Sequence, residues 1–289
     1  MDVVICVAYK DCYFLRKNLY FINKNLSPRN IYIITNKSNF GLFRKVKENI
    51  ILIDEDNMLP GLTFGTIKNV VKSHLGVNLT GWYFQQFLKM AFSLTQYAKD
   101  TYLVWDSDTV PLNPISFVDK EGHYLFAPVK DFNAAYFETI DRLFPAPKKS
   151  DSSFICEHML FDVHIMKELI SVLAKATLNN CAAETPWYLK CVYAVEPGCF
   201  QSQGFSEFET YGTYCMNYHP DVFLFRKIRN FRKGGLIYGT LGSREEIESL
   251  SVCLDTCSFE LYTYPVSIHR RLLQKLFFTY CRIKQKYLR

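Results

Sequence analysis

Asp106-Ser107-Asp108 is the segment of this 289-residue chain whose residue types and spacing are best suited to chemistry. It directly follows the apolar run Tyr102–Trp105, which has the composition of a buried β-strand. On an extended backbone residues i and i+2 face the same way, so both carboxylates would point together. Neighbouring carboxylates repel each other unless a cation lies between them, and Mg²⁺ or Mn²⁺ prefers oxygen ligands. The motif therefore predicts a divalent-metal site that neutralises a leaving nucleotide diphosphate.

Two alternatives for this motif remain open. An Asp at the end of a strand also caps backbone amides in a turn, which requires no metal. Asp106, Asp108 and Val110 in addition fit the pattern of aspartyl-nucleophile phosphatases, in which a hydrophobic strand precedes DxDx(T/V). That chemistry needs a second acidic pair after a later strand, and the sequence downstream contains neither DD nor GDxxxD. The phosphatase is therefore the weaker alternative.

Short apolar runs alternate with helical patterns through the first half of the chain. Val3–Tyr9 is apolar, Asp11–Leu26 is amphipathic, and further β-branched runs follow. Such alternation is typical of an α/β fold with a mainly parallel sheet flanked by helices. Ligands bind beyond the carboxyl ends of these strands, where the Asp106–Asp108 motif falls. In the second half we expect helices at Ala134–Phe144 and Ser206–Met216.

Four further residues lie where they could contact a nucleotide, namely Tyr9, Asp11, Gln86 and Lys89. Tyr9 could stack on a base or simply end a strand, and Asp11 is more typical of a helix N-cap than of a nucleotide contact. Gln86 and Lys89 share a polar helical stripe, which is typical of a solvated face. The alternative is that this amide and this ammonium meet the nucleotide or its phosphates.

A more specific signal comes from four segments that occur in order. They are Gly81–Lys89 (GWYFQQFLK), Tyr102–Leu112 (YLVWDSDTVPL), Ser153–Asp162 (SFICEHMLFD) and Phe205–Tyr214 (FSEFETYGTY). Together they resemble a family of bacterial glycosyltransferase-like proteins found with surface-polysaccharide genes (DUF6492). The resemblance implies a GT-A-like, Rossmann-type fold. It also implies transfer of a sugar from a nucleotide-diphosphate donor to a growing glycan or a polyprenyl-linked acceptor.

The resemblance further implies roles for individual residues. Asp106 would lie near the ribose and the metal, and Asp108 would bind Mn²⁺ or Mg²⁺ directly, with Ser107 part of the same donor-binding motif. Glu157 and His158 would contact the donor sugar or the acceptor.

Many inverting GT-A enzymes carry an adjacent acidic pair that supplies the catalytic base, and the resemblance places FSEFE there. This chain has Glu-x-Glu instead, so either Glu207 or Glu209 would be the base, with Glu207 preferred. A carboxylate base favours inversion, and retention stays open. His219 occurs in the right order for the additional histidine that often binds the metal in this class. Its setting between Tyr218 and Pro220 is equally typical of a turn.

The basic character of the chain is concentrated in its last residues. The formal net charge is +6, and the segment 266–289 carries seven basic residues and no acidic one. Its apolar and basic side chains fall on opposite arcs of a helix. We therefore expect a glycosyltransferase-like domain at 1–265 and a basic amphipathic helix at 266–289. That helix would either dock on an anionic membrane surface or pack on the body of the protein.

The composition excludes several classes of protein. Hydrophobic residues make up 49% and charged residues 21%, which is typical of a globular chain rather than a disordered one. No apolar run approaches the roughly 20 residues of a membrane span, and the N-terminus lacks the basic start of a signal peptide. No CxxC pair occurs among the ten cysteines, so we expect free thiols. These features predict a cytoplasmic protein, peripheral on the inner face of the membrane if the tail docks there.

Two classes of function remain after these exclusions. The favoured one is a glycosyltransferase, and the alternative is a glycan- or membrane-binding scaffold that has the fold without catalysis. The Asp106/Asp108 and Glu207/Glu209 pairs favour the enzyme. Nucleic-acid binding is not expected, because the basic residues are confined to one helix and no nucleic-acid motif accompanies them.

Overall fold

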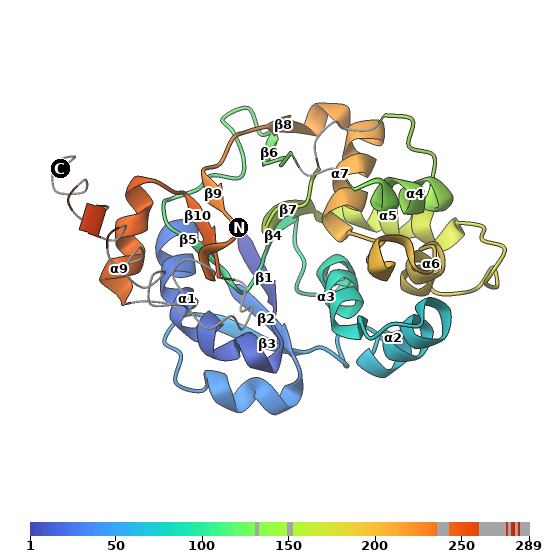
Figure 1. Cartoon of the computed structure of the whole chain (residues 1–289), viewed down its shortest axis with the longest axis horizontal. Helices are drawn as coiled ribbons and strands as arrows, with labels where there is room; N and C mark the ends of the chain where they lie inside the picture. The colour runs from blue at the N-terminus through green and yellow to red at the C-terminus, as the bar shows by residue number, and fades with distance from the viewer. Residues whose placement is uncertain are drawn as a thin grey trace.

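A five-stranded sheet with the order β3-β2-β1-β4-β7 forms the centre of the protein. The computed structural model describes residues 1–130, 133–148, 153–235 and 243–259 and positions 276, 279, 280 and 283. The strands are β1 (Asp2–Cys6), β2 (Ile31–Thr35), β3 (Ile50–Asp54), β4 (Thr101–Trp105) and β7 (His158–Asp162). The first four run parallel, and β7 is antiparallel to β4. The predicted α/β fold with a mainly parallel sheet is confirmed (Figure 1).

Successive residues of β1 show how the sheet is buried, because neighbouring side chains of a strand point to opposite faces. Val3 belongs to the apolar cluster that contains helix α1 (Cys12–Leu26). Val4 belongs to the cluster on the opposite face, which contains α3 (Thr80–Ala91). Both valines are fully buried. Helices therefore cover both faces, as a continuous apolar strand requires.

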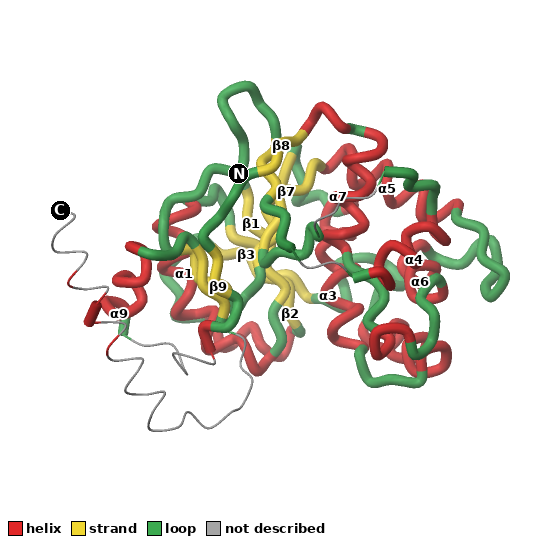
Figure 2. Tube along the Cα trace, turned by 45° about the horizontal axis from the view of Figure 1, so that its top comes forward, coloured by secondary structure: helices red, strands yellow, loops and turns green. Residues whose placement is uncertain are grey.

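Most of the helices gather on the α3 side of the sheet (Figures 1 and 2). The remaining helices are α2 (Phe64–Val70), α4 (Ala134–Leu143), α5 (Val163–Lys175), α6 (Trp187–Tyr193), α7 (Glu207–Tyr218) and the short α9 (Arg244–Ser249). The predicted helices near residues 134–144 and 206–216 correspond to α4 and α7. A Cβ added at Gly212 of α7 would collide with the ring of Phe154. Glycine thus lets α7 pack closely on the segment before β7.

Two small sheets accompany the central one. Their strands are β5 (Thr109–Pro111), β10 (Thr256–Ser258) and β9 (Asn230–Phe231) in one, and β6 (Tyr124–Phe126) and β8 (Phe223–Phe225) in the other. β5 begins directly after the Asp106–Asp108 turn and pairs antiparallel with β10. The turn therefore connects the central sheet to a second sheet, which fixes it from both sides.

Most of the predicted C-terminal helix, 266–289, lies outside the described residues. Of its positions the structure describes Leu276, Thr279, Tyr280 and Ile283, which are helical and exposed. Within the described parts of the chain, no helix is both long enough and apolar enough to span a bilayer. The boundary at residue 265 and the membrane role of the tail therefore stay predictions.

Candidate active site

The carboxyl ends of β1 and β4 meet at a cavity of about 880 Å³. Lys10 and Asp11 follow β1 and line it on one side, together with the Asp106–Asp108 turn after β4. Glu207 and Phe208, at the start of α7, line it as well. A second cavity of about 560 Å³ adjoins the first and shares several of its residues. The cavities lie where the sheet topology predicts a ligand site.

Backbone hydrogen bonds hold the Asp106–Asp108 turn. The Asp106 amide donates to the carbonyl of Glu157 (2.9 Å), and the Thr109 amide donates to the carbonyl of Asp106 (3.1 Å). The Phe259 amide donates to the carbonyl of Asp108 (2.8 Å). The backbone of the turn is fixed in this way, and both aspartates line the larger cavity.

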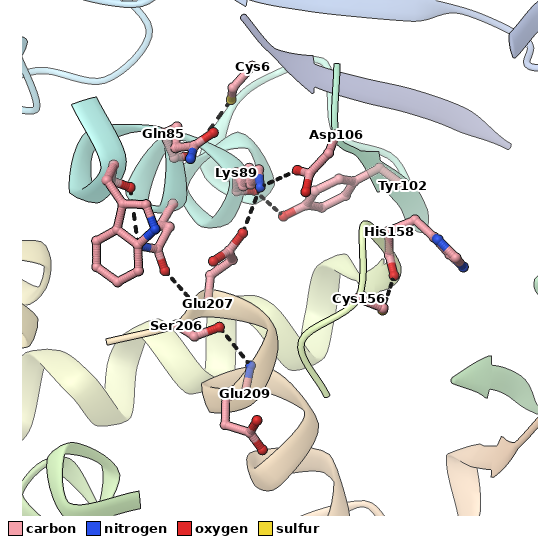
Figure 3. A network of polar contacts seen from close by, with 12 residues as sticks. Cys6, Gln85, Lys89, Tyr102, Asp106, Cys156, His158, Ser206, Glu207 and Glu209 are labelled. Atoms are coloured by element: carbon pink, nitrogen blue, oxygen red, sulfur yellow. Dashed lines mark hydrogen bonds and ion pairs between the residues drawn. The ribbon is translucent and has the colours of Figure 1, made fainter. Parts of the chain in front are cut away.

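The Lys89 ammonium lies between two carboxylates (Figure 3). Its Nζ is 2.8 Å from Asp106 Oδ1 and 2.8 Å from Glu207 Oε1. The side chains of Lys89 and Glu207 are each 4% exposed, whereas that of Asp106 is 32% exposed. Burial alone would lower the pKa of Lys89, but the two carboxylates outweigh it and raise the pKa well above its ordinary value. Lys89 therefore stays charged and joins β4 to α7.

Gln86 connects the same helix to the start of α7. Its Oε1 accepts a hydrogen bond from the Glu207 amide (3.1 Å), and its Nε2 donates to the carbonyl of Trp82 (3.1 Å). Gln86 and Lys89 are each 3% exposed, so the interpretation of their stripe as a solvated face is wrong. The stripe is polar because it meets carboxylates and a helix N-terminus rather than water. Both residues line the cavity.

Glu209 has a different environment from Glu207. Its Oε2 accepts hydrogen bonds from the Ser153 hydroxyl (2.6 Å) and the Phe154 amide (3.1 Å). Glu209 is fully buried and lines neither of these two cavities. Burial raises the pKa of Glu209 to about 7, although the two hydrogen bonds oppose the shift. Of the two glutamates considered as the base, the structure places Glu207 at the cavity.

Glu157 and His158 lie directly before and at the start of β7. The Glu157 carboxylate is 2.6 Å from Arg232 Nε and accepts a hydrogen bond from Asn230 (2.6 Å). The His158 ring stacks on Trp105 at a centroid distance of 4.8 Å and points away from the carboxylate cluster (Figure 3). Burial lowers the pKa of His158 to about 3, so its ring is neutral. Neither residue lines either of these two cavities. In this structure both lie beside the site, where Glu157 holds the cavity residue Arg232 and His158 packs on Trp105.

Tyr9 and Asp11 lie at the mouth of the site. Tyr9 is 72% exposed and lines the second cavity, whereas Asp11 lines both cavities. Asp11 occupies the N-cap position of α1, as the sequence predicted, but its side chain accepts no capping hydrogen bond from the described residues of that helix. Burial raises the pKa of Asp11, with the neighbouring Lys10 opposing the shift. Because Asp11 lines both cavities, it lies where a ligand in either one would meet it.

His219 follows the carboxyl end of α7, whereas Glu207 begins the same helix. Twelve helical residues span about 18 Å at 1.5 Å per residue. The His219 Nε2 is 3.1 Å from Glu168 Oε2 on α5. The structure therefore does not bring His219 to the Asp106–Asp108 turn, because a full helix separates it from the cavity. The expected metal ligation by His219 finds no support in this placement.

The Asp106–Asp108 turn offers the oxygen donors that Mn²⁺ or Mg²⁺ prefers. Asp106 and Asp108 line one cavity, and the side chain of Asp106 is partly exposed. Among the described residues, one group of acidic, histidine or cysteine side chains has three members close enough to hold a metal together. It consists of Asp119, Glu121 and His123, which do not line the cavity. A cation at the turn would therefore complete its coordination with diphosphate oxygens and water, as Mg²⁺ commonly does. The donor set fits such a cation.

Cys156 lines the cavity but is unsuited to nucleophilic catalysis. Burial raises the pKa of its thiol to about 12, with the Glu157 carboxylate acting in the same direction. Its Sγ donates to the carbonyl of His158 (2.6 Å). A thiol held in this protonated form is a structural side chain. The nine cysteines of the described residues are free, as predicted.

The cavity is also lined by three residues that no sequence pattern identifies, namely Arg232, Tyr136 and Phe200. Arg232 follows β9, a two-residue strand that is too short to show periodicity. The glycine pair at 234 and 235 was a signal for a turn at this point, but it says nothing of what the arginine faces. Tyr136 and Phe200 carry no charge and belong to no motif, so only the fold identifies them.

Solved structures supply the comparison for the fold. Over 97% of this chain and 95% of that chain, the fold matches a crystal structure of galactosyltransferase LgtC in complex with donor and acceptor sugar analogues, with a TM-score of 0.51 and 9% sequence identity. The chain shares the GT-A fold of LgtC. Two further structures match with lower TM-scores. One is an active-site mutant of LgtC, with a TM-score of 0.48 and 11% identity over 96% of this chain and 95% of that chain. The other is mouse xyloside xylosyltransferase 1 in its apo form, with a TM-score of 0.44 and 11% identity over 92% of this chain and 100% of that chain. No family model matches the chain and no curated protein matches it by sequence, so the family resemblance stays a prediction.

Proposed function

We propose that this protein is a metal-assisted glycosyltransferase, which moves a sugar from a nucleotide-diphosphate donor to an acceptor hydroxyl. The observation that carries the proposal is the cluster of Asp106, Asp108, Lys89 and Glu207 around one cavity. This cluster lies at the carboxyl ends of parallel strands, on a fold shared with a galactosyltransferase. The same fold match favours a transferase over the phosphatase alternative.

In this proposal the two cavities divide the donor between them. The second cavity takes the nucleoside, with Tyr9 stacking on the base and Glu55 facing it. Burial, together with the neighbouring carboxylate of Asp56, raises the pKa of Glu55 to about 7, so this group can donate or accept near neutral pH. The diphosphate lies at the Asp106–Asp108 turn. Arg232, whose side chain is 37% exposed, would bind its oxygens.

The chain's own residues would supply the remaining chemistry. Mn²⁺ or Mg²⁺, held by Asp106 and Asp108, would neutralise the charge that develops on the leaving diphosphate. Lys89 orients Asp106 and adds a fixed positive charge at the same place. Glu207 would accept the proton of the acceptor hydroxyl at the carboxylate oxygen that Lys89 does not contact. A positioned base contributes about 10² to 10⁴-fold, and a base here implies inversion.

The cellular setting that we propose is the assembly of bacterial surface polysaccharide, with a growing glycan or a polyprenyl-linked acceptor. The protein would work in the cytoplasm, with the basic segment 266–289 on the anionic inner face of the membrane. Deleting 266–289 should then move the protein from the membrane to the soluble fraction and leave donor hydrolysis in place. Unchanged membrane association of the deletion variant would refute the docking role.

The experiment that tests the proposed function is hydrolysis of a panel of nucleotide sugars with Mn²⁺, in the absence of acceptor. Asp108→Asn removes a metal-binding carboxylate but keeps its size, so we expect a loss of at least about 10²-fold. The matched control Asp221→Asn changes an exposed carboxylate after α7 and should keep full activity. Full activity in Asp108→Asn would contradict the proposal. A wild type that binds glycans but hydrolyses no donor would support the non-catalytic scaffold.

A further inference from the structure

The turn Gly198–Ser202 has an uncommon backbone. The φ angles of Phe200, Gln201 and Ser202 are 45°, 55° and 63°. This is the left-handed region, which residues with a Cβ seldom adopt. Three consecutive residues other than glycine keep such angles only where their surroundings hold them, and strained turns of this kind cluster at functional sites.

One hydrogen bond within the turn and one from α3 hold it in place. The Gly198 amide donates to Ser202 Oγ (3.1 Å), and the Tyr83 hydroxyl donates to the Ser202 carbonyl (2.5 Å). Ser202 is 1% exposed and Tyr83 is fully buried. The strained end of the turn is therefore anchored to the helix that also carries Lys89, so the turn and the carboxylate cluster share one rigid support.

The result of this conformation is an aromatic ring presented to the cavity. Phe200 is 54% exposed and lines the same cavity as Glu207. Its ring meets that of Tyr136 at a centroid distance of 6.2 Å and an interplanar angle of 74°. Exposing a phenyl ring through a strained turn does not help folding. An exposed ring is, however, what a site requires if it binds the apolar face of a ligand.

The polar groups beside this ring narrow the class of ligand. Asn133 and Gln203 line the cavity with Tyr136 and Phe200, and both carry neutral amides. The Asn133 Oδ1 accepts a hydrogen bond from the Ala135 amide (3.1 Å), which leaves its Nδ2 to donate to a ligand, whereas the Gln203 amide can donate and accept. A pyranose has one apolar face of C–H groups and a rim of hydroxyls, which matches an aromatic ring with amides at its edge. A lipid phosphate would instead call for cations at this wall. The nucleoside is accounted for by the second cavity, which Phe200 does not line.

We propose that Phe200 is the stacking platform of a carbohydrate-acceptor subsite, with Tyr136 behind it and the Asn133 and Gln203 amides binding hydroxyls of the sugar. This inference rests on the proposed function, because it takes the ring as the acceptor's place in the same cavity. It names the acceptor as a pyranose whose apolar face lies on Phe200 while one hydroxyl points to Glu207.

Saturation-transfer NMR with free sugars tests the subsite without requiring turnover. The probes are methyl β-galactoside, methyl β-glucoside, methyl α-mannoside, lactose and maltose. Phe200→Gly removes the ring and suits a positive φ, so the variant should fold at least as stably as the wild type. We expect saturation of the ring protons of at least one sugar in the wild type, and about tenfold weaker binding in Phe200→Gly.

Two control variants separate the ring from other effects. Phe225→Ala removes a phenylalanine of similar exposure, 52%, that lines neither cavity formed by the described residues, and should keep the sugar signal. Gln201→Gly relieves the backbone but keeps the ring, so it should raise the melting temperature and keep the signal. Equal sugar binding in Phe200→Gly and wild type, or no signal from any sugar in the wild type, would overturn the subsite. Donor hydrolysis by the wild type reports separately on the proposed function.

Discussion

The β4–β5 turn and the first turn of α7 each carry two acids separated by one residue, and the two regions use that spacing differently. Asp106 and Asp108 both line the larger cavity. Glu207 lines it too, but Glu209 is buried away from both cavities of the described chain. In a helix, residues i and i+2 lie about 200° apart, so they cannot face one ligand. The same spacing thus places both acids of the turn at one cavity, whereas on the helix it directs one acid to the cavity and the other away from it.

The partners of the two glutamates differ as well. A buried ammonium holds Glu207, whereas Glu209 receives its hydrogen bonds from a neutral hydroxyl and an amide. Neutral donors offset burial less than a cation does. The pKa of Glu209 is accordingly raised to about 7 by burial, despite the two bonds. One helical turn therefore presents an ion-paired carboxylate to the cavity and a carboxyl group with neutral hydrogen-bond donors to the interior.

The largest effect on stability should come from Lys89→Met. The substitution leaves Asp106 and Glu207 without their shared cation, and breaking a buried pair in this way costs about 3–5 kcal/mol. Urea unfolding of the variant measures the loss. The control Lys10→Met changes an ammonium that is 78% exposed and should stay within about 0.5 kcal/mol of the wild type. A loss below about 1 kcal/mol in Lys89→Met would show that the three groups are not held together in solution.

Glu209→Gln should have a smaller effect that depends on pH. The folded-state pKa of Glu209 is raised from its ordinary value of 4.5 to about 7 by burial. Its contribution to stability is therefore complete below about pH 4.5 and is lost as the pH rises through 7, with a total of about 3 kcal/mol. Gln resembles the protonated acid at every pH. The variant should match the wild type near pH 5 and exceed it by up to about 3 kcal/mol at pH 8.

Urea unfolding of Glu209→Gln and wild type at pH 5 and pH 8 measures this difference. Glu184→Gln, at an exposed loop position, is the control and should show no pH-dependent difference. A constant difference between Glu209→Gln and wild type at the two pH values would mean that Glu209 is ionised throughout.

The sheet and the acidic turn could be predicted from sequence because their signals are local. Apolar runs that alternate with amphipathic stretches indicate parallel strands, and the Asp106–Asp108 motif follows a run that is indeed β4. Helices α4 and α7 lie close to their predicted positions. Each of these conclusions depends on residues that are neighbours in the chain.

The surroundings of the site could not be predicted, because they depend on partners far away in the chain. A polar stripe at Gln86 and Lys89 looks the same whether it meets water or, as here, the carboxylate and the backbone amide of Glu207, more than a hundred residues later. His219 occurs at the right place in the sequence order for a metal ligand. That order does not show that the full length of α7 lies between His219 and the cavity. Phe200 is one of 24 phenylalanines, and only its backbone and its cavity set it apart.

The smallest expected effect concerns the cap that starts α7, where both glutamates lie. The Ser206 Oγ accepts a hydrogen bond from the Glu209 amide (3.3 Å), and Ser243 caps the short α9 through a bond of the same length. Ser206 is buried whereas Ser243 is exposed, so water replaces the lost acceptor more readily at Ser243. Ser206→Ala should therefore cost about 1–2 kcal/mol and Ser243→Ala about 0.5 kcal/mol in urea unfolding. Equal costs would mean that Lys89 and Gln86, rather than the cap, hold the first turn of α7 and so decide which glutamate faces the cavity.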